Sequence, residues 1–452
     1  MRRLFGTDGV RGEVGSDLTA ALAFRLGFCG AKVLAETKTK TDGRAAMLIG
    51  ADTRISSDML VAALTAGICA AGVDVYNGGV LPAPAVAYLV RKHGLSAGVV
   101  VSASHNPFGD NGIKFYSGDG FKLTDETEDE IAALEADFEN LPAAKGGDVG
   151  RALPDFDSFG DYVAFLKESV GGLDLKGFKI ALDCANGATF EAGPRIFEEL
   201  GATVSLIGNL PDGININAGC GSTHEEFLAN FVKNGDFDFG FAFDGDGDRC
   251  FAVDEAGNVV DGDMIMAVVG KHWKNQGKLA KNTIVATVMS NLGFFNTVKG
   301  FGIEAEQVKV GDRYVLERML EGGFCLGGEQ SGHIICLDRH TTGDGLFTAL
   351  VVASIVAETG KKLSALNTMV KLPQALVNAR VANEAKARVL ADAGIGAEIA
   401  ALERRFDGNG RVLVRPSGTE PVVRVMIEGA DIDEISAEAR RIADLMESLA
   451  RA

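Results

Sequence analysis

The sequence has little positive charge for its length. Lys and Arg number 44 against 62 Asp and Glu, which gives a net charge of -18. Nucleic acids and anionic membranes bind basic surfaces, so this balance argues against both as partners. The negative net charge also repels anionic small molecules, so local clusters of Arg and Lys must bind any anionic ligand.

Cysteines and long apolar runs are also scarce. The seven cysteines are scattered, odd in number and without paired spacing, so we expect reduced thiols rather than a disulfide framework or a zinc site. The longest apolar helix candidate, 347–357, is too short for a bilayer, which needs about 20 residues. Asp8 and Arg11 interrupt any apolar stretch at the start, so no signal peptide is expected. These features predict a cytoplasmic protein.

What the chain does contain is a repeated strand-helix-strand rhythm. An apolar run at 46–51, a helical stripe from Leu60 to Ile68 and a second run at 73–76 form one such unit, and similar units begin near Ile180 and Thr283. Beyond Lys371 the pattern changes to a strand, one helix over 384–405, two strands around Arg415 and a final helix. The predicted fold is three related mixed α/β domains plus a C-terminal α+β domain around a central cleft, with domains at 1–150, 151–256, 257–368 and 369–452.

Ser104 lies in VVVSASHNPFGDNGIKF, where a buried strand stops at a polar, turn-rich segment. Loops past strand ends in open α/β sheets are where ligands bind. His105 is adjacent, but consecutive extended residues point to opposite faces, which argues against a proton relay between the two. Ser102 is expected to form hydrogen bonds within the loop. A simple strand-ending turn is the alternative interpretation.

Three acids in DGDGDR, Asp244, Asp246 and Asp248, alternate with glycines between two apolar strands. Glycine lets such a loop bend, so all three carboxylates can reach one ion. Oxygen ligands select a hard metal, and magnesium takes a few carboxylates together with phosphate oxygens. The segment therefore predicts a Mg²⁺ site.

Other interpretations of this segment remain. An EF-hand needs Gly at its sixth position, where Arg249 stands, and helices where the flanks look like strands. A phosphatase with an aspartate nucleophile would leave Ser104 without a role. An acidic solvated turn is the third alternative.

Two further glycine-containing loops carry polar groups. Glu329 and Ser331 in GGEQSGH could hold neighbouring sugar hydroxyls, although a plain glycine-rich hairpin is the alternative. In RPSGTEP, Arg415 with Ser417, Gly418 and Thr419 suits a phosphate group, because a guanidinium binds two phosphate oxygens at once. An ordinary turn with solvated arginines is the alternative there.

Together, SASHNP, DGDGDR, GGEQSGH and RPSGTEP, in this order and with the start FGTDGVRG, resemble the α-D-phosphohexomutase family over the whole chain. The resemblance implies a phosphoryl group on Ser104 in the resting enzyme and one Mg²⁺ per chain. The implied site residues are, for catalysis, Ser104, Arg11, Lys114 and Arg249; for the metal, Ser104, Asp244, Asp246 and Asp248; and for substrate, Glu329, Ser331, His333, Arg415, Ser417, Gly418, Thr419 and Arg424.

Several segments, among them NINAGCGSTH and Gln330 in GEQSG, resemble the glucosamine branch of this family. That branch implies interconversion of glucosamine 6-phosphate and glucosamine 1-phosphate through glucosamine 1,6-bisphosphate, feeding UDP-N-acetylglucosamine and cell-wall synthesis. A phosphomannomutase or phosphoglucomutase, a Mg²⁺-dependent sugar phosphatase and a non-enzymatic binding module are the alternatives. The expected partner is a phosphosugar, and a homodimer is plausible.

Overall fold

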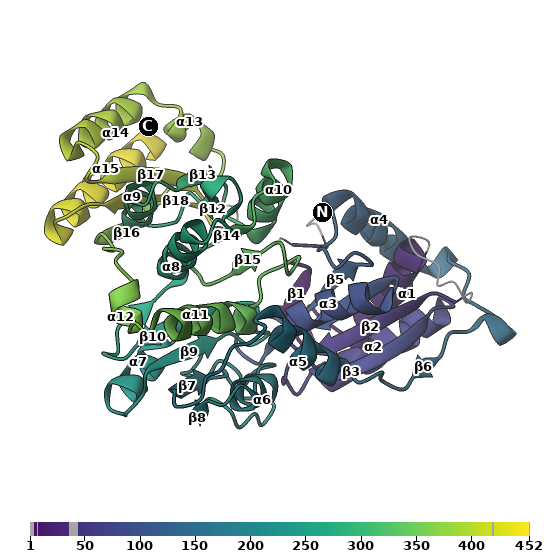
Figure 1. The fold of residues 1–452 in the computed structure, drawn as a ribbon. Helices are drawn as coiled ribbons and strands as arrows, with labels where there is room; N and C mark the ends of the chain where they lie inside the picture. Colours follow the sequence, from purple (N-terminus) through teal and green to yellow (C-terminus); the bar gives the residue numbers. More distant parts are fainter. Residues whose placement is uncertain (1–3, 7, 36–43, 418–419, 452) are drawn as a thin grey trace. The chain divides into compact units, whose positions relative to one another are not determined.

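The computed structural model describes residues 4–6, 8–35, 44–417 and 420–451 (Figure 1). The chain divides into two compact units. The first contains residues 1–289 and 302–368, and the second contains residues 290–301 and 369–452.

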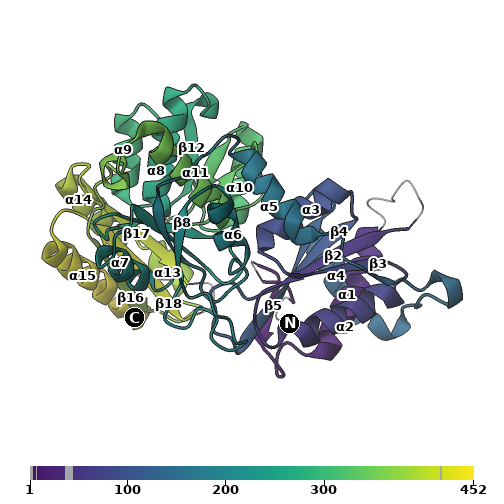
Figure 2. The same ribbon diagram turned by 60° about the horizontal axis from the view of Figure 1, so that its bottom comes forward.

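The first sheet lies in the N-terminal part of the first unit. Its strands are β1 (Val10–Glu13), β2 (Ala46–Ala51), β3 (Asp74–Val80), β4 (Ala97–Val101), β5 (Asp110–Ser117) and β6 (Ala152–Leu153), and its helices are α1 (Ala20–Leu34), α2 (Ser57–Ala70), α3 (Ala83–His93) and α4 (Asp125–Ala136). The strand order is β1-β5-β4-β2-β3-β6. β2, β3, β4 and β6 pair in parallel, whereas β5 is antiparallel to β1 and β4. Every residue of β2 and β4 is buried, because helices cover both faces, α3 on one and α1 and α2 on the other (Figure 2).

The next two sheets of this unit repeat the mixed pattern. The second has the order β11-β10-β9-β7-β8 and the third β13-β12-β14-β15. Their elements are α5 (Ser158–Ser169), β7 (Lys179–Asp183), α6 (Ala192–Glu199), β8 (Thr203–Ile207), α7 (Glu225–Lys233), β9 (Phe239–Phe243), β10 (Cys250–Asp254), β11 (Val259–Val260), α8 (Gly262–Asn275), β12 (Thr283–Thr287), β13 (Glu304–Val308), α10 (Asp312–Gly322), β14 (Leu326–Gly328), β15 (Ile334–Cys336), α11 (Gly345–Thr359) and α12 (Leu363–Leu366). In each sheet the central strands pair in parallel, and antiparallel pairs follow on one side, β9 with β10 and β10 with β11 in the second sheet and β14 with β15 in the third.

Helix α11 confirms the apolar core helix that the sequence predicts at 347–357. Most of its residues are buried, including Leu346, Leu350 and Ile355. Its N-cap is Asp344, whose Oδ1 accepts a hydrogen bond from the Phe347 N–H at 2.9 Å. Within the described ranges, the helices all fall short of the length and apolar character that crossing a bilayer requires.

The second unit is an antiparallel sheet with helices packed on it. Its elements are α9 (Leu292–Gly300), β16 (Gln374–Arg380), α13 (Lys386–Leu390), α14 (Ala393–Phe406), β17 (Arg411–Pro416), β18 (Val422–Glu428) and α15 (Ile432–Arg451). The strand order is β16-β18-β17, and α15 packs on β16 and β18 through Ile435, Ala439 and Ile442.

The predicted fold class is confirmed, since three mixed α/β sheets precede a C-terminal α+β part. The prediction of one helix over 384–405 was wrong. The chain ends α13 and begins α14 at Asp392, whose side chain accepts hydrogen bonds from the N–H groups of Gly394 and Ile395 at 2.8 and 3.0 Å. All seven cysteines are free, as expected. The domain boundaries stay predictions.

Candidate active site

Ser104 lies three residues beyond the buried strand β4, inside a loop, and is only 2% exposed. Its hydroxyl donates a hydrogen bond to Asp244 Oδ2 at 2.6 Å. Its φ of 53° lies in the left-handed region, which a residue with a Cβ seldom adopts. The expected separation from His105 was therefore wrong, because it assumed an extended backbone: Ser104 Oγ lies 3.4 Å from His105 Nδ1.

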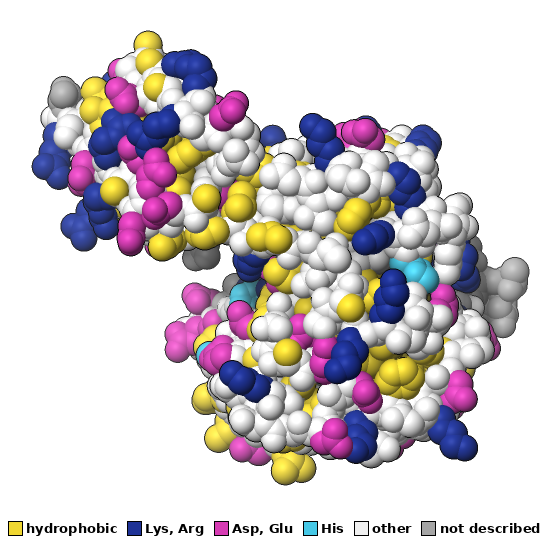
Figure 3. Space-filling model, turned by 60° about the vertical axis from the view of Figure 1, so that its left-hand side comes forward, with side chains coloured by type: hydrophobic (Ala, Val, Ile, Leu, Met, Phe, Trp, Pro, Cys, Tyr) yellow, Lys and Arg dark blue, Asp and Glu magenta, His cyan; other side chains and the backbone are white. Residues whose placement is uncertain are grey.

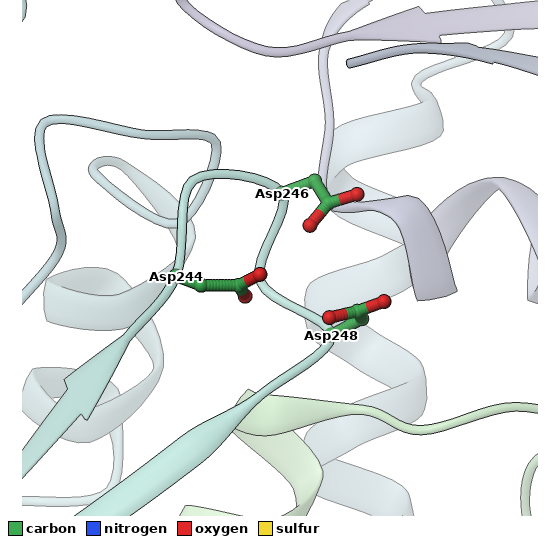
Figure 4. A group of neighbouring side chains, drawn as sticks. All are labelled: Asp244, Asp246 and Asp248. Carbon is green, nitrogen blue, oxygen red and sulfur yellow. The ribbon is translucent and has the colours of Figure 1, made fainter. Parts of the chain in front are cut away.

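Asp244, Asp246 and Asp248 occupy the loop between β9 and β10, and their side chains converge (Figure 4). One carboxylate oxygen from each lies within 4.8 Å of the others, and all three residues are buried. Gly247 allows the turn with a φ of 71°. The three carboxylates thus lie together around a glycine turn, as the sequence predicts.

The electrostatics of this loop call for a cation. Burial, followed by the charges of Asp248 and Asp246, raises the pKa of Asp244 well above its ordinary value. Asp246 Oδ1 and Asp248 Oδ1 are buried and find no hydrogen-bond donor in the described part of the chain. Two orphaned carboxylate oxygens beside a third acid fit a hard divalent ion, so these residues suit Mg²⁺.

The predicted basic residues face this acidic loop. Lys114 Nζ lies 2.7 Å from Asp246 Oδ2 and 2.8 Å from Asp8 Oδ2. Burial alone would lower the pKa of Lys114, but Asp246 and Asp8 raise it above its ordinary value, so this amine holds its proton. Arg11 pairs with Asp8 and donates from Nη1 to Ala103 O at 3.2 Å. β1 pairs with β5, which explains why Arg11 and Lys114 lie at the same edge of the sheet.

The GGEQSGH segment forms the hairpin between β14 and β15. Gly332 N–H bonds to Glu329 O at 3.0 Å, so the turn falls between Glu329 and Gly332, and the extended geometry assumed for Glu329 and Ser331 was wrong. Glu329 Oε1 accepts from the Gly311 N–H at 3.0 Å, whereas Ser331 Oγ is buried without a hydrogen-bond partner in the described ranges. His333 Nδ1 lies 3.4 Å from Asp248 Oδ2.

A cavity of about 560 Å³ joins these groups within the first unit. The predicted residues among its lining are Arg11, Ser104, Asp248, Arg249, Glu329 and His333. Lys114, Asp244 and Asp246 lie behind it, through the contacts given above. Ser331 is not part of this lining.

The lining residues that were missed from the sequence include Asp8, Lys122 and Asp312. Lys122 Nζ bridges Asp8 Oδ1 and Asp312 Oδ2, each at 2.6 Å. Asp312 also lies 3.7 Å from His333 Nε2. Asp8 stands in the quoted start FGTDGVRG and was therefore within reach of the sequence argument, but no motif pointed to the other two.

The predicted phosphate loop lies in the second unit, between β17 and β18. Arg415 and Arg424 are directly opposed on the two strands, and burial, followed by the charge of Arg424, lowers the pKa of Arg415. Arg424 Nη2 pairs with Glu420 at 2.8 Å. Two opposed guanidinium groups suit an anion. Gly418 and Thr419 lie outside the described residues.

Sequence reasoning also missed Lys386, whose side chain binds the backbone of this loop. Its buried ammonium group donates to Ser417 O and Glu420 O, each at 2.6 Å. The two carbonyls flank the loop, so one cation fixes both of its ends.

Models of known protein families match the chain in four consecutive segments. They are phosphoglucomutase/phosphomannomutase alpha/beta/alpha domain I over residues 2–140, domain II over 160–257, domain III over 261–372 and the C-terminal domain over 376–445. The chain belongs to the phosphoglucomutase/phosphomannomutase family.

Curated relatives that are 51–54% identical to this phosphohexomutase are named phosphoglucosamine mutase. The phosphoglucosamine mutase of Clostridium acetobutylicum is 54% identical to it over 452 residues, 100% of both chains. Membership of the family makes the chain an enzyme, an isomerase of the mutase type.

Solved structures of other phosphohexomutases share the fold. A family protein from Burkholderia thailandensis matches with a TM-score of 0.83 at 25% identity, covering 99% of this chain and 98% of that one. The N-acetylphosphoglucosamine mutase of Aspergillus fumigatus, solved with GlcNAc-6P and magnesium, matches with a TM-score of 0.68 at 19% identity, covering 99% of this chain and 96% of that one.

Proposed function

We propose that this phosphohexomutase interconverts glucosamine 6-phosphate and glucosamine 1-phosphate through a phosphoserine at Ser104. The observation that carries the proposal is the hydrogen bond of 2.6 Å between the Ser104 hydroxyl and Asp244, which places an alcohol directly against a triad of buried acids. The choice of sugar is supported by the relatives named phosphoglucosamine mutase at 54% identity.

The reaction proceeds in two balanced transfers. The bond from phosphorus to Ser104 Oγ breaks as a bond forms to the 1-hydroxyl of glucosamine 6-phosphate, giving glucosamine 1,6-bisphosphate and free Ser104. The proton of the sugar hydroxyl passes to a basic group in the cavity, and that group gives it to Ser104 Oγ, which leaves as an alcohol. After the bisphosphate turns over, its 6-phosphoryl group moves to Ser104, whose proton returns to the new sugar hydroxyl, and glucosamine 1-phosphate leaves.

One Mg²⁺ per chain would be held by Asp244, Asp246 and Asp248, with an oxygen of the Ser104 phosphoryl group as a further ligand. When bound, it neutralises charge on the transferring group. Arg11, Lys114 and Arg249 add positive charge around the reacting oxygens. Because Lys114 is held protonated by Asp246 and Asp8, it suits stabilisation of negative charge or proton donation better than proton abstraction.

The remaining predicted residues bind the parts of the substrate that do not react. Glu329 and His333, which line the cavity, would contact the sugar, whereas the sugar contact of Ser331, which lies outside that lining, stays a prediction. Arg415, Ser417, Gly418, Thr419 and Arg424 would hold the distant phosphate group. For the bisphosphate to turn over, this phosphate site must accept either end of the sugar, which calls for release and rebinding.

A comparison of three substrates tests the proposal. The purified chain, primed with the matching 1,6-bisphosphate, is assayed with glucosamine, mannose and glucose 6-phosphates, and intact-mass spectrometry reports phosphate on Ser104. We expect the highest kcat/KM with glucosamine 6-phosphate and a phosphorylated Ser104. A preference for mannose or glucose would transfer the assignment to those branches. Steady phosphate release with an unmodified Ser104 would instead identify a phosphatase.

Partners and location follow from the same proposal. A small phosphosugar is the expected ligand. On the face shown in Figure 3, basic and acidic side chains are intermixed, in keeping with a net charge of -18. The free thiols agree with a cytoplasmic location. A homodimer stays a prediction.

A further inference from the structure

The loop that carries Ser104 is wrapped around a buried guanidinium group. Arg54 lies between β2 and α2, and its side chain is 0% exposed. From Nη2 it donates to Ser104 O at 3.0 Å and to Asn106 O at 2.8 Å. From Nη1 it donates to Asp110 O at 3.1 Å and to Pro107 O. One cation therefore binds four carbonyl groups of a loop only seven residues long, from 104 to 110.

Arg54 has no donor left for a ligand. A guanidinium has five N–H groups, and the fifth, at Nε, donates to Asp52 Oδ2 at 2.9 Å. Asp52 is itself held by Ser57 Oγ at 3.2 Å. An arginine beside a phosphorylated serine suggests phosphate binding, but every donor of Arg54 points at protein oxygen atoms.

The same network reaches Ser104 from its N-terminal side. Asp52 Oδ2 accepts from Ser102 Oγ at 2.6 Å, and Ser102 Oγ accepts from the Ser104 N–H at 2.9 Å. The ion pair of Arg54 and Asp52 thus holds Ser104 at both ends: Arg54 binds its carbonyl, and Asp52 binds its N–H through Ser102. The expected role of Ser102, hydrogen bonding within its loop, agrees with this arrangement.

The acidic loop meets Ser104 at the same carbonyl group. Asn217 Nδ2 donates to Ser104 O at 2.9 Å, and a Cβ added at Gly245 would lie 2.5 Å from that oxygen. Ser104 also keeps a φ of 53°, a conformation costly enough to need support from its surroundings. Rotating the Ser104 peptide would break these contacts and carry Oγ away from Asp244.

We propose that Arg54 is a positioning residue for phosphoryl transfer, which holds the strained Ser104 backbone so that the phosphoserine faces the acidic triad. It touches neither the substrate nor the reacting atoms. The inference rests on the proposed function for its kinetic part, and on the loop geometry alone for its structural part. Replacing Arg54 should therefore lower kcat without changing the affinity for the substrate.

The test compares Arg54→Lys with Arg44→Lys in the full chain. Arg44 also binds backbone carbonyls, of Val149 at 2.9 Å and of Gly147, but not those of the Ser104 loop. A lysine at 54 has three donors and lacks the planar fork, so it cannot bind all four loop carbonyls and Asp52. We expect kcat to fall about 100-fold in Arg54→Lys, the cost of misplacing a reacting group by about 1 Å, with KM unchanged within about threefold. Arg44→Lys should keep the wild-type kcat.

Hydrogen exchange supplies a readout that does not depend on the sugar. Amides in 102–112 should exchange faster in Arg54→Lys than in wild type, with no change there in Arg44→Lys. If wild type fails to convert glucosamine phosphates while this difference persists, the proposed function falls and the positioning role stands. A folded Arg54→Lys with wild-type kcat and exchange overturns the inference, as does a rise in KM at constant kcat. If Arg54→Lys does not fold, Asn217→Ala tests the same carbonyl, and an unchanged kcat there overturns it too.

Discussion

The loop after β4 and the loop between β17 and β18 both present a hydroxyl group, yet they are supported differently. Arg54 donates to four carbonyls of the first loop, whereas in the second loop, of which residues 418 and 419 are not described, Lys386 donates to Ser417 O and Glu420 O. In the proposed mechanism, the first loop carries the group that must meet phosphorus at one position, and the second binds a phosphate from either end of a sugar. A guanidinium that binds four carbonyls suits the first of these roles.

The largest effect is expected at the nucleophile. Ser104→Ala removes the only oxygen proposed to carry phosphorus, so kcat should fall by at least about 10,000-fold. Turnover of glucosamine 6-phosphate and intact mass measure the loss. Ser102→Ala is the control, since it keeps Ser104 Oγ and loses only the bonds to Asp52 and the Ser104 N–H, and it should be much milder. Comparable losses in both variants would contradict the assignment of Ser104.

A smaller but still large effect is expected at the acidic triad. Asp246→Asn should lower kcat by about 100-fold or more and raise the Mg²⁺ concentration needed for half activity, because the ion supplies several kcal/mol of charge stabilisation. Treatment of wild type with a chelator should abolish turnover, and added Mg²⁺ should restore it. Asp254→Asn is a matched control, because Asp254 is buried at the end of β10 but lies outside the triad. Full activity after chelation would argue against the metal.

The phosphate loop should respond in KM instead. Arg415→Ala or Arg424→Ala removes a charged hydrogen bond of about 1.5–3 kcal/mol, which corresponds to a KM raised about 10- to 150-fold. Steady-state kinetics separates this from a loss of kcat. Arg441→Ala, which removes exposed pairs with Glu398 and Glu438, should change neither constant. A fall in kcat without a rise in KM would remove the contrast between the two loops.

The smallest effect concerns stability rather than rate, and it is expected in the first unit but not in the second. Burial raises the pKa of Asp344 to about 7, whereas in the unfolded chain it is about 4. Between these pH values the folded chain keeps a proton on Asp344 that the unfolded chain has already released. The stability of the first unit should therefore fall as pH rises from 4 to 7, by at most about 1.4 kcal/mol per pH unit from this group.

Denaturant unfolding across that range measures the slope. Asp344→Asn should flatten it, because the amide oxygen still accepts from the Phe347 N–H while no proton can be lost. Asp392→Asn, a cap of α14 in the second unit, should leave the slope as it is in wild type. An equal change in both variants would show that the slope has another origin.

Much of the fold and part of the site follow from local patterns in the sequence. Apolar runs predict β2 and β4, and the acids and glycines of DGDGDR predict a turn with converging carboxylates. The resemblance to the family adds the pairing of Ser104 with that turn. Lys122 could not be found this way, because its partners Asp8 and Asp312 lie 114 and 190 positions away and no spacing records that contact.

Two other failures have local causes that sequence patterns do not reveal. The positive φ of Ser104 turns its side chain toward His105, against the alternation assumed for an extended chain. The role of Arg54 is hidden because four of its five side-chain N–H groups donate to backbone carbonyls, and such contacts leave no pattern of side-chain types. Its partners are identified by position in space, since any residue offers the same carbonyl group.

Gly245 allows the loop that carries the three acids to pack directly against the loop that carries Ser104. A Cβ there would lie 2.5 Å from Ser104 O and 2.9 Å from Asn217 Nδ2, so the two stretches meet backbone to backbone. The alcohol and its first acid are 140 positions apart in the chain. During synthesis, the N-terminal sheet therefore emerges before the acid that binds its serine. If Ser104 has the proposed role, its ability to pass on phosphorus arises when the later stretch has folded against it.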